Sequence, residues 1–300
     1  MSVSAQPTHV QLPLPGGQEG ASVRLHPLLS GELLSPLGLL ERPSGSMSTL
    51  RGLHSGGRAN WVWLPVPAFL VEHPGAGPIL IDTGLHPSIV FDPSQNWGRL
   101  GARVYRFRMT AEQAVPEQLR ARGIDPGDVA HVVMTHLHTD HASGVSEFPR
   151  ATFVLDRREW ESATAPRGTL RGYRTAQFDY GFDWRTIDYD APEVDSFATF
   201  AHSVDLFGDG SVRLLATPGH TPGHQSVLLR LGEGEALLTA DAAYERRTID
   251  HDVEQLFLAD KHLYWRSLKE IRRFVESTPT AVVIPGHDRE LWPTLEAVYD

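Results

Sequence analysis

The chain contains no cysteine. This absence excludes disulfide bonds, thiolate metal sites and cysteine nucleophiles together, so any bound metal must be held by nitrogen and oxygen ligands. The sequence also lacks a run of Lys or Arg, and its 27 basic and 37 acidic residues give a formal charge of −10. Such a balance disfavours nucleic acids and anionic membranes as partners.

Long apolar stretches are missing as well. No uninterrupted apolar run approaches the roughly 20 residues that a membrane-spanning helix needs. The N-terminal residues do not combine a charged region with an apolar one, so we find no signal peptide and expect a cytoplasmic protein. With 300 residues, 41% of them hydrophobic, the chain can bury a large core.

Apolar runs and turn residues predict strands mixed with helices, without regular βαβ alternation. This order indicates an α+β fold in which sheets pack together and are covered by helices. The predicted strands occupy residues 22–28, 61–72, 78–82, 130–135, 151–156, 211–216, 225–231, 235–239 and 281–284. The predicted helices occupy residues 116–122, a segment starting near 157, and 261–276.

The remaining segments are expected to be irregular. Residues 1–21, rich in Pro, Gly and Gln, are expected to form a flexible arm, and residues 22–300 a single domain. Residues 41–57 are dense in Ser and Gly and are predicted to form a loop. The aromatic and charged segment 161–200 is expected to form a cap over a cleft.

The most informative segment is THLHTDH at 135–141, directly after an apolar run. Most histidines and nearly all aspartates lie near water, so this cluster needs a partner that compensates its polarity. A metal ion does so best. His136 and His138 stand two positions apart and can grip one ion, whereas Asp140 and His141 then point towards a second.

Three further candidate ligands, His220, Asp241 and His287, each follow an apolar strand-like run. Polar groups at strand ends converge on one edge of a sheet, and Pro and Gly before the two histidines make tight turns. A catalytic zinc usually takes three protein ligands and water, so seven candidates predict two metals that share one carboxylate. Two such metals can polarise a carbonyl or phosphoryl oxygen, which indicates a hydrolase. We expect divalent zinc, with iron, cobalt or manganese as alternatives.

The motif HxHxDH, the segment TPGHTPGH, an Asp after an apolar strand and a C-terminal GHD together resemble the metallo-β-lactamase superfamily. The resemblance implies a four-layer αββα sandwich. It implies a first metal on His136, His138, His220 and Asp241, and a second on Asp140, His141, His287 and Asp241. Within the superfamily, residues 65–84, residues 218–226 and Tyr244 are similar to the N-acyl-homoserine lactonase family.

That similarity implies an enzyme that opens the ring of N-acyl-homoserine lactones and thereby quenches quorum sensing. A metal-bridging hydroxide would attack the lactone carbonyl, Tyr244 would stabilise the oxyanion, and Asp140 would pass a proton to the leaving alkoxide. Asp82 is expected to orient a ligand imidazole, and His224 to be a hydrogen-bonding or core histidine. The resemblance also implies a homodimer.

Other activities use the same ligands. A thioesterase of the glyoxalase II type would need a basic patch for its anionic substrate, and the C-terminal third offers Arg246, Arg247, Lys261, Arg266 and Lys269. A phosphotriesterase is a further alternative. A non-hydrolytic diiron redox protein is less favoured, because that branch typically replaces a histidine of HxHxDH with a carboxylate and carries a flavin domain.

Some positions depart from the lactonase pattern or have two interpretations. Thr139 stands where relatives often carry an aromatic residue. Four aromatic side chains are interpreted either as walls of an acyl pocket or as packing under the cap: Trp97, Phe107, Phe182 and Trp184. The remaining histidines, His26 and His73 among them, are interpreted as surface or loop residues.

Overall fold

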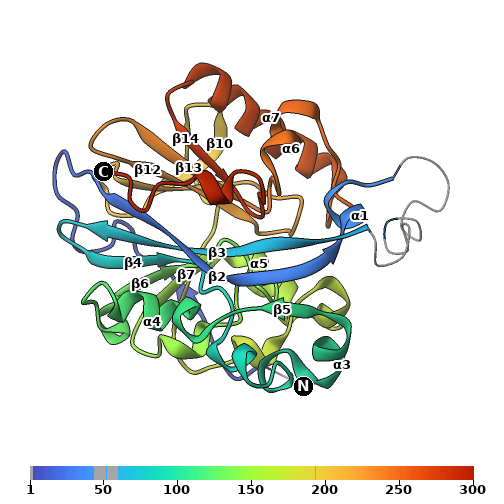
Figure 1. Ribbon diagram of the computed structural model, residues 1–300. Helices are drawn as coiled ribbons and strands as arrows, with labels where there is room; N and C mark the ends of the chain where they lie inside the picture. The colour runs from blue at the N-terminus through green and yellow to red at the C-terminus, as the bar shows by residue number, and fades with distance from the viewer. Residues whose placement is uncertain (1–2, 44–51, 53–59, 193) are drawn as a thin grey trace.

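A computed structural model describes residues 3–43, 52, 60–192 and 194–300. Most of the loop expected at 41–57 therefore lies outside the described residues. The described strands form two sheets (Figure 1). The first sheet has the order β1-β8-β7-β6-β4-β3-β2-β5, and the second has the order β14-β13-β12-β11-β10-β9.

The strands of the first sheet are β1 (Thr8–His9), β2 (Arg24–Pro36), β3 (Trp61–His73), β4 (Gly77–Ile81), β5 (Arg106–Arg108), β6 (His131–Val133), β7 (Thr152–Asp156) and β8 (Asp183–Ile187). Those of the second are β9 (Asp195–Phe197), β10 (Phe200–Asp205), β11 (Val212–Ala216), β12 (Gln225–Arg230), β13 (Glu235–Ala240) and β14 (Val282–Pro285). The α-helices are α1 (Leu37–Leu40), α3 (Ser94–Val104), α4 (Val115–Arg120), α5 (Arg157–Thr164), α6 (Arg246–His251) and α7 (Lys261–Ser277).

The layers are held together by separate groups of buried apolar side chains. One lies between the sheets and includes Val71 and Leu229. The second joins the first sheet to α4 and α5, and the third joins the second sheet to α6 and α7. Figure 1 shows α6 and α7 on the outside of one sheet and α4 and α5 on the outside of the other. The predicted four-layer αββα sandwich is therefore confirmed.

Burial on both faces explains the composition of the central strands. In β3, the run Leu64–Val71 is buried without interruption, because one face of the strand packs against the second sheet and the other against helices. Such strands are continuously apolar rather than alternating. The predicted strands and helices all appear, mostly within two residues of their expected ends.

Two expectations about irregular segments differ from the structure. Residues 3–21 do not extend away as a free arm, since β1 pairs with β8 and Val10 and Leu14 are buried between the sheets. The segment 161–200 is only in part a cap. It contains β8 and β9, which are strands of the two sheets, and only residues 169–173 of its length line the pocket described below.

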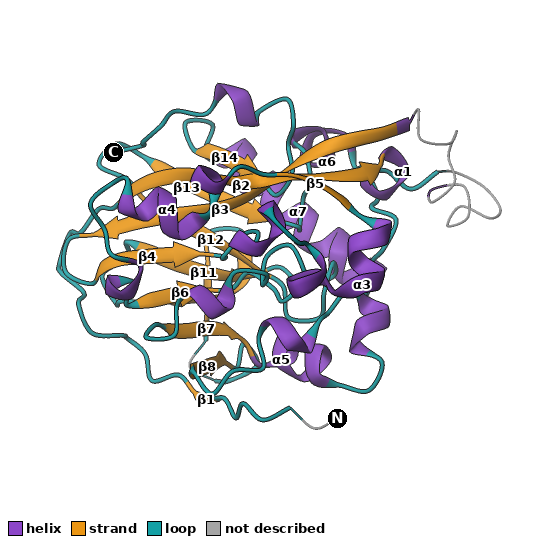
Figure 2. Ribbon diagram, turned by 60° about the horizontal axis from the view of Figure 1, so that its bottom comes forward, coloured by secondary structure: helices purple, strands orange, loops and turns teal. Residues whose placement is uncertain are grey.

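The direction of the strands places the functional side chains at one end of the sandwich. Strands β4, β6 and β7 are parallel, and β11, β13 and β14 also share one direction. The candidate ligands follow the carboxyl ends of these strands. Figure 2 shows α1, α3 and α5 towards the same end. Among the described residues, no helix is long and apolar enough to cross a membrane.

Candidate metal centre and pocket

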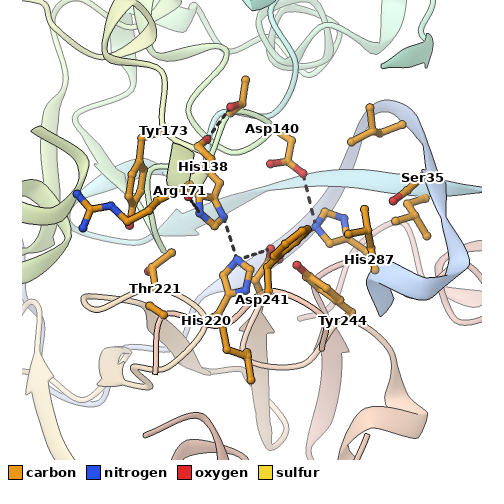
Figure 3. A pocket seen from close by; sticks show the side chains of 18 of the residues that line it. Ser35, His138, Asp140, Arg171, Tyr173, His220, Thr221, Asp241, Tyr244 and His287 are labelled. Atoms are coloured by element: carbon orange, nitrogen blue, oxygen red, sulfur yellow. Dashed lines mark hydrogen bonds and ion pairs between the residues drawn. The ribbon is translucent and has the colours of Figure 1, made fainter. Parts of the chain in front are cut away.

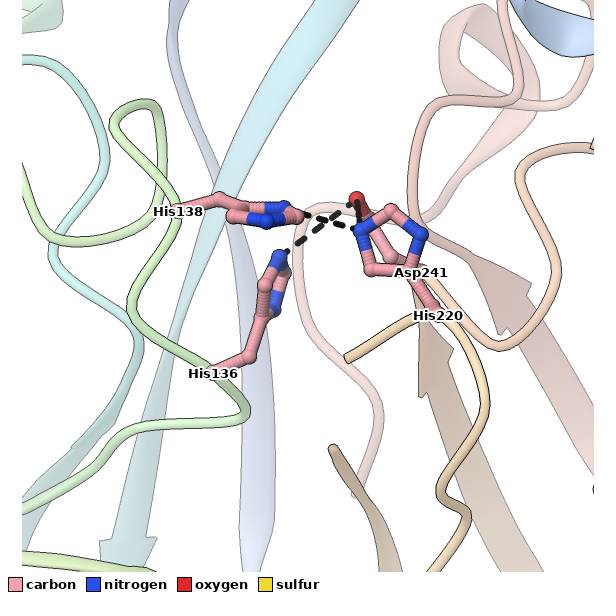
Figure 4. Close-up of side chains that lie close together, drawn as sticks. All are labelled: His136, His138, His220 and Asp241. Carbon is pink, nitrogen blue, oxygen red and sulfur yellow. Dashed lines mark hydrogen bonds and ion pairs between the residues drawn. The ribbon is translucent and has the colours of Figure 1, made fainter. Parts of the chain in front are cut away.

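The first candidate group combines side chains from three loops. His136 and His138 follow β6, His220 follows β11, and Asp241 directly follows β13. Their potential ligand atoms lie within 4.8 Å of one another (Figure 4). Nδ1 of His138 lies only 2.9 Å from Nε2 of His220. The four residues predicted for the first metal are therefore brought together.

The second group consists of Asp140, His141 and His287, whose ligand atoms also lie within 4.8 Å of one another. Asp241 lies between the two groups. Its Oδ2 is 3.3 Å from Nε2 of His220, and its Oδ1 is 3.3 Å from Nε2 of His141 and 3.2 Å from Nε2 of His287. Each carboxylate oxygen thus faces one group, which is the geometry that a shared ligand requires.

Asp82 orients two of the rings from behind, as the sequence predicted for it. Its Oδ2 lies 2.7 Å from Nδ1 of His141 and accepts the hydroxyl of Thr135 at 2.7 Å. The Thr135 hydroxyl oxygen is in turn 3.1 Å from Nδ1 of His136. Because both Nδ1 atoms are engaged here, both Nε2 atoms are directed into the centre.

The other rings are also anchored through the nitrogen that faces away from the centre. The partners are the Arg171 carbonyl for His138 at 2.9 Å, Oε1 of Gln255 for His220 at 3.1 Å, and the Pro65 carbonyl for His287 at 2.8 Å. Each partner belongs to a segment far from its histidine in sequence. Such hydrogen bonds fix the ring and leave its inner nitrogen free to bind a cation.

The donor set fits metal ions. Nε2 of His136, Nε2 of His141 and Oδ1 of Asp241 are buried and have no hydrogen-bond partner among the described residues. Leaving buried polar atoms unpaired costs free energy, whereas bound cations would satisfy all three. Burial, followed by the charge of His141, lowers the pKa of His136 well below its ordinary value, and burial does the same for His220. Both rings are therefore neutral, as metal ligands must be.

Charge compensation shapes the rest of the centre. Burial opposes ionisation of Asp241, but His287 and His141 outweigh it and hold the pKa of this carboxyl well below its usual range. Burial likewise disfavours a charged His141, yet Asp241 and Asp82 raise its pKa well above the ordinary value. The carboxylate thus attracts positive charge to the place where the two groups meet.

The backbone is distorted beside the ligands. Asp82 and Ala240 adopt left-handed conformations with φ of 58° and 44°, which non-glycine residues rarely do, and Ala240 directly precedes Asp241. Gly286, before His287, is equally constrained, because a Cβ atom there would lie 2.6 Å from Oδ1 of Asp241. Backbone strain is thus present at two positions where the carboxylate and the imidazoles converge.

Tyr244 lies against both groups. Its ring centroid is 5.6 Å from that of His220 and 5.4 Å from that of His287. Figure 3 shows Asp140, Tyr244 and His287 together on one side of the pocket. Burial, followed by the charges of Asp241 and Asp140, raises the pKa of Tyr244 well above its ordinary value. The phenol is therefore protonated and can donate a hydrogen bond.

A cavity of about 460 Å³ opens above the two groups. His138, Asp140, His220, Asp241, Tyr244 and His287 form its floor. Its walls are mostly apolar: Leu33, Leu39, Leu40, Leu64, Trp97, Tyr105, Leu170, Phe257 and Leu258. An apolar cavity over a few convergent polar groups is typical of a small-molecule site.

The four aromatic side chains of uncertain role divide between the two interpretations. Trp97 lines the cavity, and Phe107 packs edge-to-face against it without reaching the cavity. Phe182 and Trp184 instead stack on Phe153 beneath the first sheet, so their interpretation as a pocket wall is wrong. Of the two interpretations of Phe182 and Trp184, only packing agrees with the structure.

Several histidines also have roles in packing. His224 is buried, its Nδ1 lies 2.9 Å from the Thr217 hydroxyl, and its Nε2 accepts the backbone N–H of Asp241, which confirms a hydrogen-bonding core histidine. The interpretation of His26 and His73 as surface residues is wrong, since both are buried in strands. Nε2 of His73 lies 3.1 Å from the Asp209 carboxylate. No local sequence motif predicts this pairing.

The chain is similar to proteins of a known family. Residues 61–287 match the family described as the metallo-β-lactamase superfamily. The chain is 40% identical over 239 residues to the N-acyl homoserine lactonase AttM of Azorhizobium caulinodans, covering 78% of this chain and 85% of that protein. It is 31% identical over 232 residues to an N-acyl homoserine lactonase of Bacillus cereus, covering 77% of this chain and 84% of the relative.

Solved structures share the fold. An N-acyl homoserine lactone hydrolase, determined with the product N-hexanoyl-L-homoserine at its catalytic metal centre, superposes with a TM-score of 0.72 at 23% identity. The match covers 94% of this chain and 98% of that one.

Proposed function

Because the chain belongs to the metallo-β-lactamase superfamily, within the N-acyl homoserine lactonase family, we propose that it is a metal-dependent lactonase that opens the ring of N-acyl homoserine lactones. One observation carries the proposal. Two groups of ligand atoms meet at the Asp241 carboxylate, beneath a cavity into which Tyr244 faces.

We assign the first metal to His136, His138, His220 and Asp241 and the second to Asp140, His141, His287 and Asp241. Divalent cations bound there would polarise the ester carbonyl and lower the pKa of water towards neutrality. Histidine nitrogen and carboxylate oxygen suit zinc, although iron, cobalt and manganese accept the same ligands. The unpaired inner atoms of His136, His141 and Asp241 support this assignment.

Tyr244 and Asp140 take part in the chemistry itself. The protonated Tyr244 phenol lies against both groups and donates a hydrogen bond to the oxygen that becomes negative when the carbonyl is attacked. Asp140 accepts no hydrogen bond from the described residues, and its Oδ2 lies 3.7 Å from Nε2 of His287. The Asp140 carboxylate oxygen that does not bind the second metal can take the proton of the attacking water and return it to the ring oxygen that leaves.

The walls of the cavity suit an acyl chain better than an anionic thioester. Most of the cations that such a thioester would need are already engaged, in the ion pairs Arg246–Asp250, Arg247–Glu41, Lys261–Glu254 and Arg266–Glu270. None of these cations lines the cavity in the described part of the chain. The arginine that does line it, Arg171, donates to the Ser162 carbonyl.

We also propose a homodimer. On α3, Leu100 and Val104 stand one turn apart and are 77% and 51% exposed, and Phe91 nearby in sequence is 83% exposed. Apolar groups gathered on a surface are typical of interfaces. Light scattering should give twice the chain mass for the wild type and the monomer mass for Leu100→Glu, and a monomeric wild type would refute the dimer.

The experiment that tests the function is a substrate panel on zinc- or cobalt-loaded protein. It contains short- and long-chain N-acyl homoserine lactones, a simple γ-lactone, S-lactoylglutathione and paraoxon. We expect ring opening of the acylated lactones to have the highest kcat/KM. Tyr244→Phe should lower kcat by roughly 10²-fold with unchanged metal content, because a donor to the oxyanion is lost. No lactone turnover by folded, fully loaded protein would exclude this function.

A further inference from the structure

Glu159 is a fully buried carboxyl group behind the first group of ligands, in the first turn of α5. Its two oxygens serve two different loops. Oε1 accepts the backbone N–H of Leu137 at 2.9 Å, and Oε2 accepts that of Gly223 at 3.3 Å. A buried carboxyl group is costly, so its retention here calls for a role.

Both loops carry candidate metal ligands. Leu137 lies between His136 and His138, and Gly223 lies three residues after His220. The second loop approaches α5 so closely that a Cβ atom on Gly223 would lie 2.2 Å from the backbone nitrogen of Glu159. Only glycine permits this distance, so the loop packs directly against the backbone of α5 at Glu159.

Two hydroxyl groups complete the surroundings of Glu159. Thr221 follows His220, and the Tyr173 ring packs on His138 with centroids 5.1 Å apart. Figure 3 shows Thr221 and Tyr173 on the side of the pocket where His138 and His220 lie. Both hydroxyls lie beside the Glu159 carboxyl, and the Tyr173 hydroxyl also lies beside those of Ser162 and Thr221. Contacts of Glu159 therefore reach a neighbour of each histidine of the first group.

We propose that Glu159 is a positioning residue that fixes the two loops bearing His136, His138 and His220 relative to each other, and so sets the affinity of the first metal. Asp82 does the equivalent by direct contact with His141 of the second group. The inference rests on the metal-binding part of the proposed function and not on the identity of the substrate.

Glu159→Gln is the sharpest test. Glutamine has the same size, but its NH₂ end cannot accept a hydrogen bond, so one of the two loops loses its anchor. The variant is made in a His287→Ala background, in which the second group is incomplete, so that the remaining zinc reports on the first group. We expect zinc to pass to a coloured chelator about 10- to 100-fold faster than from His287→Ala alone, as for other residues that orient metal ligands.

Glu161→Gln is the matched control. Glu161 lies in the same helix, 57% of its side chain is exposed, and it pairs with Arg157 on the surface. Its substitution should leave the rate of zinc loss unchanged. Equal rates for Glu159→Gln and Glu161→Gln would overturn the inference.

Tyr173→Phe covers the case in which Glu159→Gln does not fold. This variant keeps the ring on His138 and removes one hydroxyl beside the carboxyl group, so we expect a smaller acceleration of zinc loss. No acceleration in this variant would also count against the role of Glu159. If His287→Ala and the wild type bind no zinc at all, the proposed function fails instead, and the two failures are thereby distinguished.

Discussion

The two candidate metal-binding groups differ in how many of their side chains are held by hydrogen bonds. In the first, every histidine has a hydrogen-bond partner behind it, and Glu159 joins the two loops that carry them. In the second, His141 and His287 are anchored, but Asp140 accepts no hydrogen bond from the described residues and 17% of its side chain is exposed to the cavity.

This difference separates two tasks. Polarising a carbonyl requires charges that are fixed before the reaction begins, because reorganising them would cost free energy at the transition state. Transferring a proton requires a carboxylate whose oxygens are not already occupied by donors. We therefore expect the first group to polarise the carbonyl and Asp140 to transfer the proton.

Removing Asp241, the carboxylate that we propose to be shared by the two metals, should have the largest effect. In Asp241→Ala both groups lose a ligand, so we expect less than one metal equivalent by elemental analysis. A metal ion contributes several kcal/mol to transition-state stabilisation, so kcat/KM should fall by roughly 10³-fold or more. Asp250→Ala, a surface carboxylate paired with Arg246, is the control. Two retained equivalents would show that Asp241 is not shared.

Asp140→Asn tests the side chain of the second group that accepts no hydrogen bond from the described residues. The amide keeps the shape of the side chain but cannot accept the proton, so kcat should fall by about 10²- to 10⁴-fold. The first metal should stay bound, because its ligands and their anchors are unchanged. Metal analysis together with kcat across pH distinguishes the loss of the proton acceptor from a loss of bound metal. A variant with normal kcat would remove Asp140 from the proton pathway.

The pH dependence of folding should single out Glu159. Burial raises the pKa of Glu159 to about 7, so the folded state keeps a proton that the unfolded chain releases near pH 4.5. The free energy of unfolding therefore falls as pH rises from about 4.5 to 7, by about 3 kcal/mol from this group. In urea titrations of metal-free protein, Glu159→Gln should lose less stability than the wild type between pH 5 and 7.5. Identical losses of stability in the variant and the wild type would contradict the raised pKa of Glu159.

The sequence predicted which candidate ligands converge because each of these side chains follows an apolar strand, and this pattern is local in sequence. Asp82 was found in the same way, after β4. Glu159 and Gln255 were missed because nothing near them in sequence shows that Glu159 binds the backbone of Leu137 or that Gln255 binds the ring of His220. Only the packing of α5 and the loop before α7 brings them there.

Segments without a clear periodicity were predicted less well. The strand β8 was not predicted, because the aromatic residues Phe182 and Trp184 are as typical of a cap as of a buried strand. Residues 3–21 lack long apolar runs, yet single residues such as Val10 reach the core. The cytoplasmic location and the native metal stay predictions.

The smallest effect on kinetics is expected at the rim of the cavity, where the side chains are exposed and not held by the hydrogen bonds of the floor. Leu170 lines the cavity and is 82% exposed, so a long acyl chain that leaves the cavity would cover it. Leu170→Ala should cost about 1 kcal/mol of this contact, or roughly a five-fold rise in KM for dodecanoyl homoserine lactone. The KM for the butanoyl compound should not change, because its chain is too short to reach the rim. Leu12→Ala, at an exposed leucine outside the cavity lining, is the control. An equal rise for both substrates would place the acyl chain elsewhere.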